Sequence, residues 1–149
     1  MTVAIRPLRQ SDEAEWRALW TAYLEFYESS VEEEVYQTTF QRLLGSDPHD
    51  FSGFVAENDG RLVGLTHYVF HRHGWKVNNV CYLQDLYATP EMRGKGVGRK
   101  LIEAVYDAAD RAGAPDVYWM TQDFNAEARV LYDRIGTLTP FIKYQRVTA

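Results

Sequence analysis

Three glycines and four cations gather in one short stretch of this chain, residues 93–100. Because Gly94, Gly96 and Gly98 lack side chains, the backbone N–H groups around them stay uncovered. The apolar spacing that follows predicts a helix, whose first N–H groups lack partners and carry a partial positive charge. Together these features predict a binding site for a phosphate or a pyrophosphate at the start of that helix.

The stretch does not match the two best-known nucleotide-binding motifs. A P-loop requires G-x-x-x-x-G-K-[ST], and this string does not occur in the chain. A dinucleotide-binding fingerprint spaces its glycines as G-x-G-x-x-G, whereas the glycines here fall at 94, 96 and 98. A glycine-rich connector without a ligand and a nucleotide-binding protein that uses the same loop are the alternatives.

Two further segments complete a pattern with this loop. Tyr82–Tyr87 reads Tyr-Leu-Gln-Asp-Leu-Tyr, and Asn125–Tyr132 begins with an Asn and ends in a Leu-Tyr pair. With Arg93, Gly96 and Gly98, they resemble the GNAT acetyltransferase superfamily, whose pyrophosphate loop reads Arg-x-x-Gly-x-Gly. The first segment is nearest to the Tyr-Leu-Glu-Asp-Phe-Phe run of diamine (spermidine/spermine) acetyltransferases.

The resemblance implies acetyl-CoA as co-substrate, and no metal. Backbone groups of Leu86, Tyr87 and Ala88 would pair with the pantetheine arm, and one N–H would polarise the thioester carbonyl. Asn125 would hydrogen-bond the pantetheine or the backbone beside it. The pyrophosphate would be held by the residues of the loop, namely Arg93, Gly94, Lys95, Gly96, Val97, Gly98 and Arg99.

The resemblance places Tyr132 beside the sulfur as general acid, because a phenol with an ordinary pKa of about 10 is protonated at neutral pH. A core position on its helix is the alternative for Tyr132. Diamine-type relatives carry Glu where this chain has Gln84, so Asp85 is the nearest carboxylate that could act as base. Strand alternation turns Asp85 away from Gln84, which leaves a water chain or a neutral amine as alternatives. We expect Tyr27, Glu28, Gln84 and Asp85 to bind the amine.

The function implied is N-acetyl transfer from acetyl-CoA to a primary amine by direct attack in a ternary complex. The amine would belong to a polyamine, a diamine or an amino-acid-like small molecule. A protein lysine or a peptide is the alternative acceptor. A module that binds acyl-CoA without turnover is the alternative of another class, and Gln84 keeps it open. The resemblance also implies a homodimer paired through the last strand.

Composition bounds the class of protein. The chain has 149 residues, of which 46% are apolar, so we expect one folded domain over residues 1–149. A net charge of −5 argues against a nucleic-acid partner, and no apolar run is long enough to span a membrane. The single cysteine, Cys81, suits a reducing cytoplasm.

The apolar periodicity predicts an α/β fold of the α+β kind, with a GNAT-like mixed sheet. Asp12 and Glu15 are expected to form a capping box at the first helix. Strand, helix and strand between residues 82 and 121 predict a central parallel βαβ unit, whereas the hairpins before it predict antiparallel pairing, with helices on both faces. The predicted strands cover residues 3–7, 51–57, 62–71, 80–88, 117–121 and 141–147. The predicted helices cover residues 16–27, 32–44, 98–112 and 125–135.

Overall fold

A computed structural model describes residues 2–148 of the chain, which divides into two compact units. Residues 1–119 contain a five-stranded sheet with three α-helices in their described part. Residues 120–149 contain one helix and the C-terminal segment.

The strands lie in the sheet in the order in which they follow along the chain. They are β1 (Ala4–Pro7), β2 (Ser52–Asn58), β3 (Arg61–His71), β4 (Val80–Ala88) and β5 (Val117–Tyr118). Neighbours are antiparallel except β4 and β5, which are parallel, as the βαβ pattern predicts. Asp59 and Gly60 turn β2 into β3 with φ values of 52° and 77°, the left-handed conformation that a two-residue hairpin loop favours.

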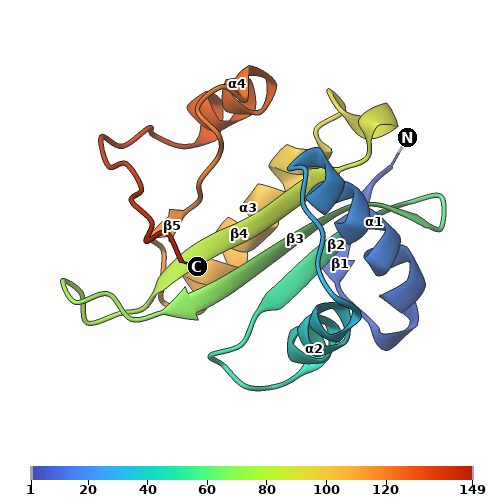
Figure 1. The fold of residues 1–149 in the computed structure, drawn as a ribbon, viewed down its shortest axis with the longest axis horizontal. Coiled ribbons are helices and arrows are strands. Elements are labelled where there is room, and N and C mark those ends of the chain that lie inside the picture. Colours follow the sequence, from blue (N-terminus) through green and yellow to red (C-terminus); the bar gives the residue numbers. More distant parts are fainter. Residues whose placement is uncertain (1, 149) are drawn as a thin grey trace. The chain divides into compact units, whose positions relative to one another are not determined.

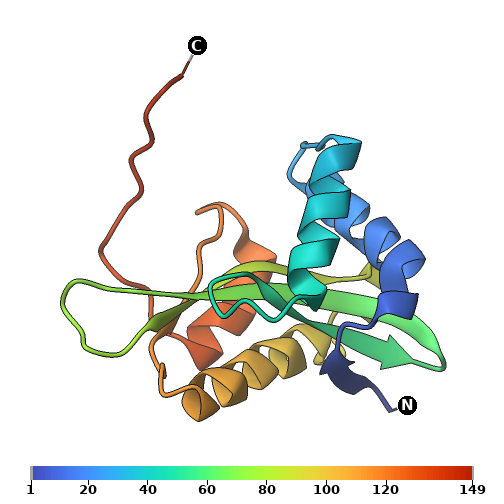
Figure 2. The same cartoon turned by 90° about the horizontal axis from the view of Figure 1, so that it is seen from below.

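Helices cover both faces of this sheet (Figure 1). Helices α1 (Glu13–Phe26) and α2 (Glu33–Leu44) pack on one face, and α3 (Val97–Arg111) packs on the other (Figure 2). Each face has its own apolar cluster, one around Trp16 of α1 and one around Leu101 of α3. The sheet is therefore buried on both sides, and the start of α3 is held against its second face.

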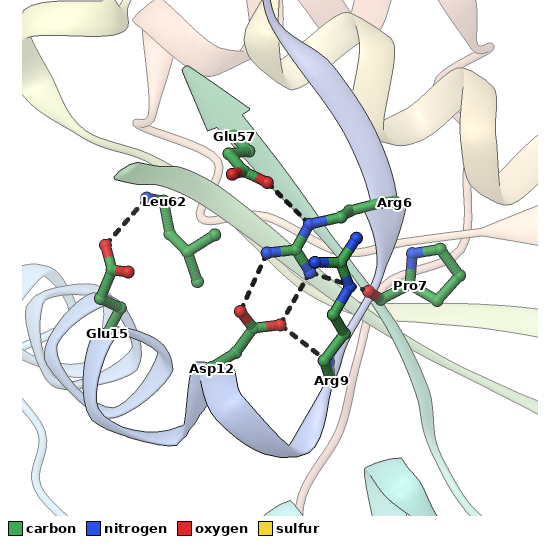
Figure 3. A network of polar contacts seen from close by, with 7 residues as sticks. All are labelled: Arg6, Pro7, Arg9, Asp12, Glu15, Glu57 and Leu62. Atoms are coloured by element: carbon green, nitrogen blue, oxygen red, sulfur yellow. Dashed lines mark hydrogen bonds and ion pairs between the residues drawn. The ribbon is translucent and has the colours of Figure 1, made fainter. Parts of the chain in front are cut away.

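The beginning of α1 differs from the prediction. Asp12 does not cap the helix, because its carboxylate accepts two hydrogen bonds from Arg6, at 2.8 and 2.9 Å. It accepts a third, at 2.7 Å, from the backbone N–H of Arg9 (Figure 3). Glu15 accepts instead from the backbone N–H of Leu62 at 2.9 Å. The predicted capping box is wrong because Arg6 of β1 binds the carboxylate of Asp12 and the backbone of Leu62 in β3 binds that of Glu15.

The second unit holds α4 (Ala126–Ile135) and an irregular segment after it. The strand predicted over residues 141–147 is wrong, since these residues have no regular structure. Alternating apolar residues favour a strand, but a strand exists only beside a hydrogen-bonded neighbour. The predicted strand over residues 117–121 is likewise shortened to β5. Several apolar side chains of the segment are more than three quarters exposed: Phe141, Ile142, Tyr144 and Val147.

Candidate active site

Strand β4 carries much of the predicted site. It pairs with β3 along most of its length, but with β5 only at Cys81 and Tyr82. Among the described residues, the backbone groups of β4 that face away from β3 therefore have no strand partner beyond Tyr82. Leu86 and Ala88 lie in this part of β4, so their backbone is placed to pair with an extended ligand.

The pairing of β3 with β4 contains a bulge at Gln84. His67 lies opposite Asp85, but the next residue, Tyr68, lies opposite Leu83, so Gln84 has no partner in the register. A bulge bends a strand and redirects its side chains. Here the side chain of Gln84 is exposed, whereas that of Asp85 is buried.

The glycine-rich loop leads from β4 into α3. Gly94 and Gly96 have φ values of 78° and 84°, in the left-handed region that glycine tolerates best. A Cβ atom built on either residue would meet nothing within 4 Å. Helix α3 begins at Val97, and the backbone N–H of Lys100 donates to the carbonyl of Gly96 at 3.0 Å. The N–H groups that precede Lys100 in the helix have no carbonyl of this helix to bind, as at any helix start.

Cations surround this loop. Lys95, Arg99 and Lys100 are exposed. The Nε atom of Arg99 lies 3.6 Å from Oε1 of Glu103. Arg93 is held more firmly, because its Nε donates to the carbonyl of Ala88 at 3.3 Å. The open space over the glycines, the helix start and these charges together fit a diphosphate group.

The guanidinium of Arg93 also lies over two aromatic rings, those of Phe26 and Tyr87, at 5.7 Å from each ring centre. Phe26 ends α1, whereas Tyr87 belongs to β4. Cation–π contacts of this length are attractive. The loop is therefore tied to the first helix and to the central strand.

A buried polar network lies under α1, and the sequence analysis did not anticipate it. The Nδ1 atom of His67 lies 2.8 Å from Oδ2 of Asp85, and the indole Nε1 of Trp16 donates to His67 Nε2 at 3.0 Å. Trp16 is fully buried, and His67 and Asp85 are 3% and 6% exposed. Because an indole N–H can only donate, His67 Nε2 must be unprotonated. The proton of the neutral ring is therefore on Nδ1 and is donated to Asp85.

Tyr23 of α1 is partly buried and lies near enough to Asp85 for the two groups to interact electrostatically. Burial, followed by the charge of Asp85, raises the pKa of Tyr23 well above its ordinary value. The phenol consequently stays protonated at neutral pH. Its ring also contacts that of Tyr27, edge to face, with 5.2 Å between the centres.

The predicted amine-binding residues fall into two groups. Tyr27, which is partly buried, and the exposed Glu28 follow the end of α1, and Glu28 has a φ of 56°. Gln84 and Asp85 lie on β4. The sequence analysis missed His67. Its position opposite Asp85 follows from the strand register, and this register depends on the bulge at Gln84.

Asn125 and Tyr132 belong to the second unit. Asn125 precedes α4, and its Oδ1 accepts a hydrogen bond from the backbone N–H of Ala128 at 3.5 Å, so it caps this helix. Tyr132 lies on α4 and is partly buried. The predicted approach of both residues to the loop and to β4 remains a prediction.

Among the described residues, no group of three or more His, Cys, Asp or Glu side chains is arranged to hold a metal ion. No helix in the described part of the chain combines the length and the apolar composition that a membrane span requires.

Residues 16–137 match the acetyltransferase (GNAT) family. The chain belongs to this family. It is 37% identical over 145 residues to the D-amino-acid N-acetyltransferase HPA3 of Saccharomyces cerevisiae, a match that covers 97% of this chain and 90% of that protein. It is also 37% identical over 75 residues to the thialysine N-epsilon-acetyltransferase of Bos taurus, which covers 50% of this chain and 44% of that protein.

Solved structures of similar fold include acetyltransferases. The enzyme AAC(6')-Iy in complex with a bisubstrate analogue has a TM-score of 0.86 at 19% identity, with both chains covered completely. The same enzyme in complex with CoA has a TM-score of 0.84 at 19% identity, covering 99% of this chain and 96% of that one. These likenesses confirm the predicted GNAT fold class.

Proposed function

We propose that this chain transfers the acetyl group of acetyl-CoA to the primary amine of a small molecule, by direct attack in a ternary complex. The observation that carries the proposal is the loop between β4 and α3. Its left-handed Gly94 and Gly96 leave open space beside a helix start and exposed cations. This arrangement fits the diphosphate of a coenzyme, and the family supplies acetyl transfer as the chemistry.

The remaining parts of the cofactor have counterparts along β4. The backbone of Leu86, Tyr87 and Ala88, beyond the pairing with β5, would bind the pantetheine arm. An N–H of this stretch would polarise the thioester carbonyl as negative charge develops on its oxygen. Asn125 would help to hold the arm, and Tyr132 would protonate the departing thiolate.

We favour an amino-acid-like amine as the acceptor. The relatives that support this choice are named for D-amino acids and for thialysine. Gln84 replaces the Glu of the diamine-type pattern, which weakens the case for a polyamine. Tyr27, Glu28 and Gln84 would line the acceptor side. The alternative acceptor is a protein lysine or a peptide.

The test combines calorimetry of CoA binding with thiol release from acetyl-CoA over a panel of amines. We expect wild type to bind CoA and to release thiol with D-amino acids or thialysine. Gly96→Ala should bind CoA about tenfold more weakly, because an alanine in this conformation is strained by about 1–2 kcal/mol and the free loop would relax away from it. Gly60→Ala is the matched control, since Gly60 has a φ of 77° and open space, but lies in the β2–β3 turn.

The outcomes separate the candidate functions. Amine-dependent thiol release that Tyr132→Phe lowers supports the enzyme. Tight CoA binding with no release on any amine would instead favour the acyl-CoA-binding module. Absence of both heat and release would overturn the proposal. We further propose a homodimer and, from the buried single cysteine Cys81, a cytoplasmic location.

A further inference from the structure

The two neighbouring polar residues of β4, Gln84 and Asp85, are poorly suited to take the proton of an acceptor ammonium. The side-chain amide of Gln84 has no site that is protonated at useful pH. Asp85 is 6% exposed, and its carboxylate is already hydrogen-bonded to His67 at 2.8 Å. A bound amine would have to displace a buried side chain before it touched this carboxylate.

The direction of the proposed coenzyme along β4 indicates where its acetyl group would lie. The diphosphate would bind the loop that follows β4, and the pantetheine arm would run back along Ala88 and Leu86. The acetyl group would then lie nearer the start of the strand, toward Gln84. In that direction β4 reaches its pairing with β5, which ends at Tyr82 and Tyr118. This place where β4 and β5 part, the fork, is therefore close to the proposed reaction centre.

Tyr118 and His71 form a hydrogen-bonded pair at the fork. The hydroxyl oxygen of Tyr118 lies 2.8 Å from Nε2 of His71, and Nδ1 of His71 lies 2.8 Å from the carbonyl oxygen of Arg72. Because a carbonyl can only accept, Nδ1 carries the proton of the neutral ring. Nε2 is then an acceptor, and the hydroxyl of Tyr118 donates to it.

This pair lies on the face of the sheet that α1 covers. The extra residue of the bulge is on β4, so side chains alternate regularly along β3, and His71 points to the same side as His67. The ring of His67 in turn contacts Trp16 of α1. Tyr118 follows its register partner Tyr82, on whose ring it stacks with 4.8 Å between the centres. Tyr118 is 42% exposed, and its hydroxyl oxygen can accept a hydrogen bond from a ligand while it donates to His71.

We propose that Tyr118 contacts the acceptor ammonium and passes its proton to His71. The inference rests on the function proposed above. One N–H bond of the ammonium breaks as an O–H bond forms at the phenolic oxygen, and the original hydroxyl proton of Tyr118 moves to Nε2 of His71. The amine becomes neutral and nucleophilic, His71 becomes an imidazolium, and Tyr118 ends protonated as it began. The proton later passes from the partly exposed His71 to water.

The chemistry of the two side chains suits this division of roles. Imidazole is the side chain that takes up and releases a proton near neutral pH, so His71 can hold the proton during one turnover. Burial raises the pKa of Tyr118, so a free phenolate would not persist, whereas a concerted exchange never forms one. Tyr118 thus touches the substrate, and His71 acts through it.

The other titratable and charged groups beside the pair come from β4, from the start of β5 and from the turn after β3. Burial raises the pKa of both Tyr82 and Cys81, so neither is charged at neutral pH. Asp116, just before β5, forms an ion pair with Lys76 at 2.7 Å. Arg72 is exposed, so water screens its charge. None of these groups competes with the imidazole for the proton.

The first experiment uses two variants that each remove one part of the pair. His71→Gln keeps an oxygen that can accept from Tyr118, but it cannot take up a proton. Tyr118→Phe keeps the stacked ring without the hydroxyl. We expect each variant to lower kcat/KM for D-alanine about 100-fold, the lower end of general acid–base catalysis, with CoA affinity unchanged.

The matched controls lose the same chemical groups elsewhere in the chain. His73→Gln removes an imidazole from the turn after β3, where its Nδ1 accepts from the backbone N–H of Trp75 at 3.1 Å. Tyr36→Phe removes a hydroxyl of α2 that lies 2.6 Å from Oγ1 of Thr21. Both controls should retain the wild-type kcat/KM and the wild-type pH profile.

The protonation of the amine separates a lost base from a structural defect. In wild type, kcat/KM should level off with rising pH once His71 is neutral. In His71→Gln and Tyr118→Phe it should continue to rise, because these variants depend on amine that is already neutral. With trifluoro-D-alanine, whose amine is largely neutral at neutral pH, the deficit of both variants should shrink.

A second readout does not depend on turnover. In protein labelled with ¹⁵N-histidine and saturated with CoA, the neutral ring of His71 should carry its proton on Nδ1, and His71→Gln identifies its signals by their loss. The Nε2 signal should shift when D-alanine is added. Tyr118→Phe should abolish this shift while preserving the Nδ1–H tautomer, because the carbonyl of Arg72 still accepts.

The inference is overturned if either variant binds CoA normally and retains both the wild-type kcat/KM and the wild-type pH profile. An equal deficit with the two amines would also overturn it, because a structural defect would not distinguish them. A neutral His71 ring that is protonated at Nε2 would contradict the direction of the hydrogen bond. Failure of the proposed function looks different, since wild type itself would then release no thiol with any amine.

Discussion

Arg6 of β1 binds two carboxylates, that of Asp12 just before α1 and that of Glu57 on β2. Its guanidinium binds both oxygens of Asp12, and its Nε donates to Glu57 at 2.8 Å (Figure 3). The hydrogen bond from Arg6 is the main cause that lowers the pKa of Asp12, and burial opposes it. The ion pair is therefore a source of stability that depends on pH.

We predict that Asp12→Asn lowers the free energy of unfolding by about 2 kcal/mol, because it breaks a charge-assisted pair with a largely buried partner. Since the pKa of Asp12 is lowered in the folded state, this stabilisation is complete above the ordinary Asp value of about 3.9. It is lost as the pH falls further through the folded pKa. Urea unfolding between pH 3 and 7 would measure the difference in unfolding free energy between wild type and variant, which should become smaller as the pH falls.

The control for this prediction is the exposed ion pair of Arg17 with Glu33. Glu33 is 62% exposed, so Glu33→Gln should change the unfolding free energy little at any pH in that range. Equal losses in the two variants would contradict a special role for the Arg6 pair.

Single residues show where sequence reasoning succeeds and where it fails. Gly94 and Gly96 lie in the left-handed region with open space over them, as expected of turn glycines, because turn chemistry is local. Asp12 and Glu15 matched a local capping pattern, yet distant partners took both carboxylates. His67 was missed for the same reason, since its partner is fixed by strand register and not by spacing.

At the scale of elements, the approach of α3 to the sheet depends on one small residue. A Cβ atom on Gly64 of β3 would lie 2.9 Å from the carbonyl oxygen of Tyr87 and 3.0 Å from Cγ1 of Val97. It would also lie 3.2 Å from Cδ1 of Leu101. The absence of a side chain at Gly64 thus lets β4 and the first turns of α3 lie close to β3.

We predict that Gly64→Ala lowers the free energy of unfolding by about 1–3 kcal/mol, as overpacking of a close-packed core does. It should also weaken CoA binding, because the loop moves with the start of α3. Thermal unfolding and calorimetry would measure the two effects. Gly74→Ala is the control, since a Cβ there meets nothing within 4 Å, and a similar loss in both variants would contradict the prediction.

Elements were predicted well where their signal was long and periodic. The bounds of β4 agree fully, and α3 begins and ends one residue earlier than predicted. The last strand was wrong, because its alternation of apolar residues needs a neighbouring edge that the described residues do not provide. The bulge at Gln84 has no sequence signature of its own, although it decides which side chain faces the core.

At the scale of the whole molecule, residues 141–147 carry several exposed apolar side chains, which a second copy of the chain could cover. We predict a homodimer in solution, with twice the mass of one chain by light scattering at micromolar concentration. Phe141→Ser should shift the equilibrium toward monomer, because Phe141 is 80% exposed and would lose its apolar contact on dimerisation.

The matched control for Phe141→Ser is Trp75→Ser. Trp75 is 85% exposed, but lies between β3 and β4, far along the chain from the C-terminal segment. Trp75→Ser should leave the mass of the protein in solution unchanged. A wild-type protein that is monomeric at micromolar concentration would contradict the predicted homodimer.

The side chain of Arg93 is held in place before any ligand binds. A long, flexible side chain normally loses about 0.5–1.5 kcal/mol of conformational freedom when a ligand immobilises it. Arg93 has already given up much of that freedom, because Phe26, Tyr87 and the carbonyl of Ala88 hold it. Loss of the aromatic ring at position 26 would therefore weaken the proposed binding of the coenzyme, without altering any residue of the loop.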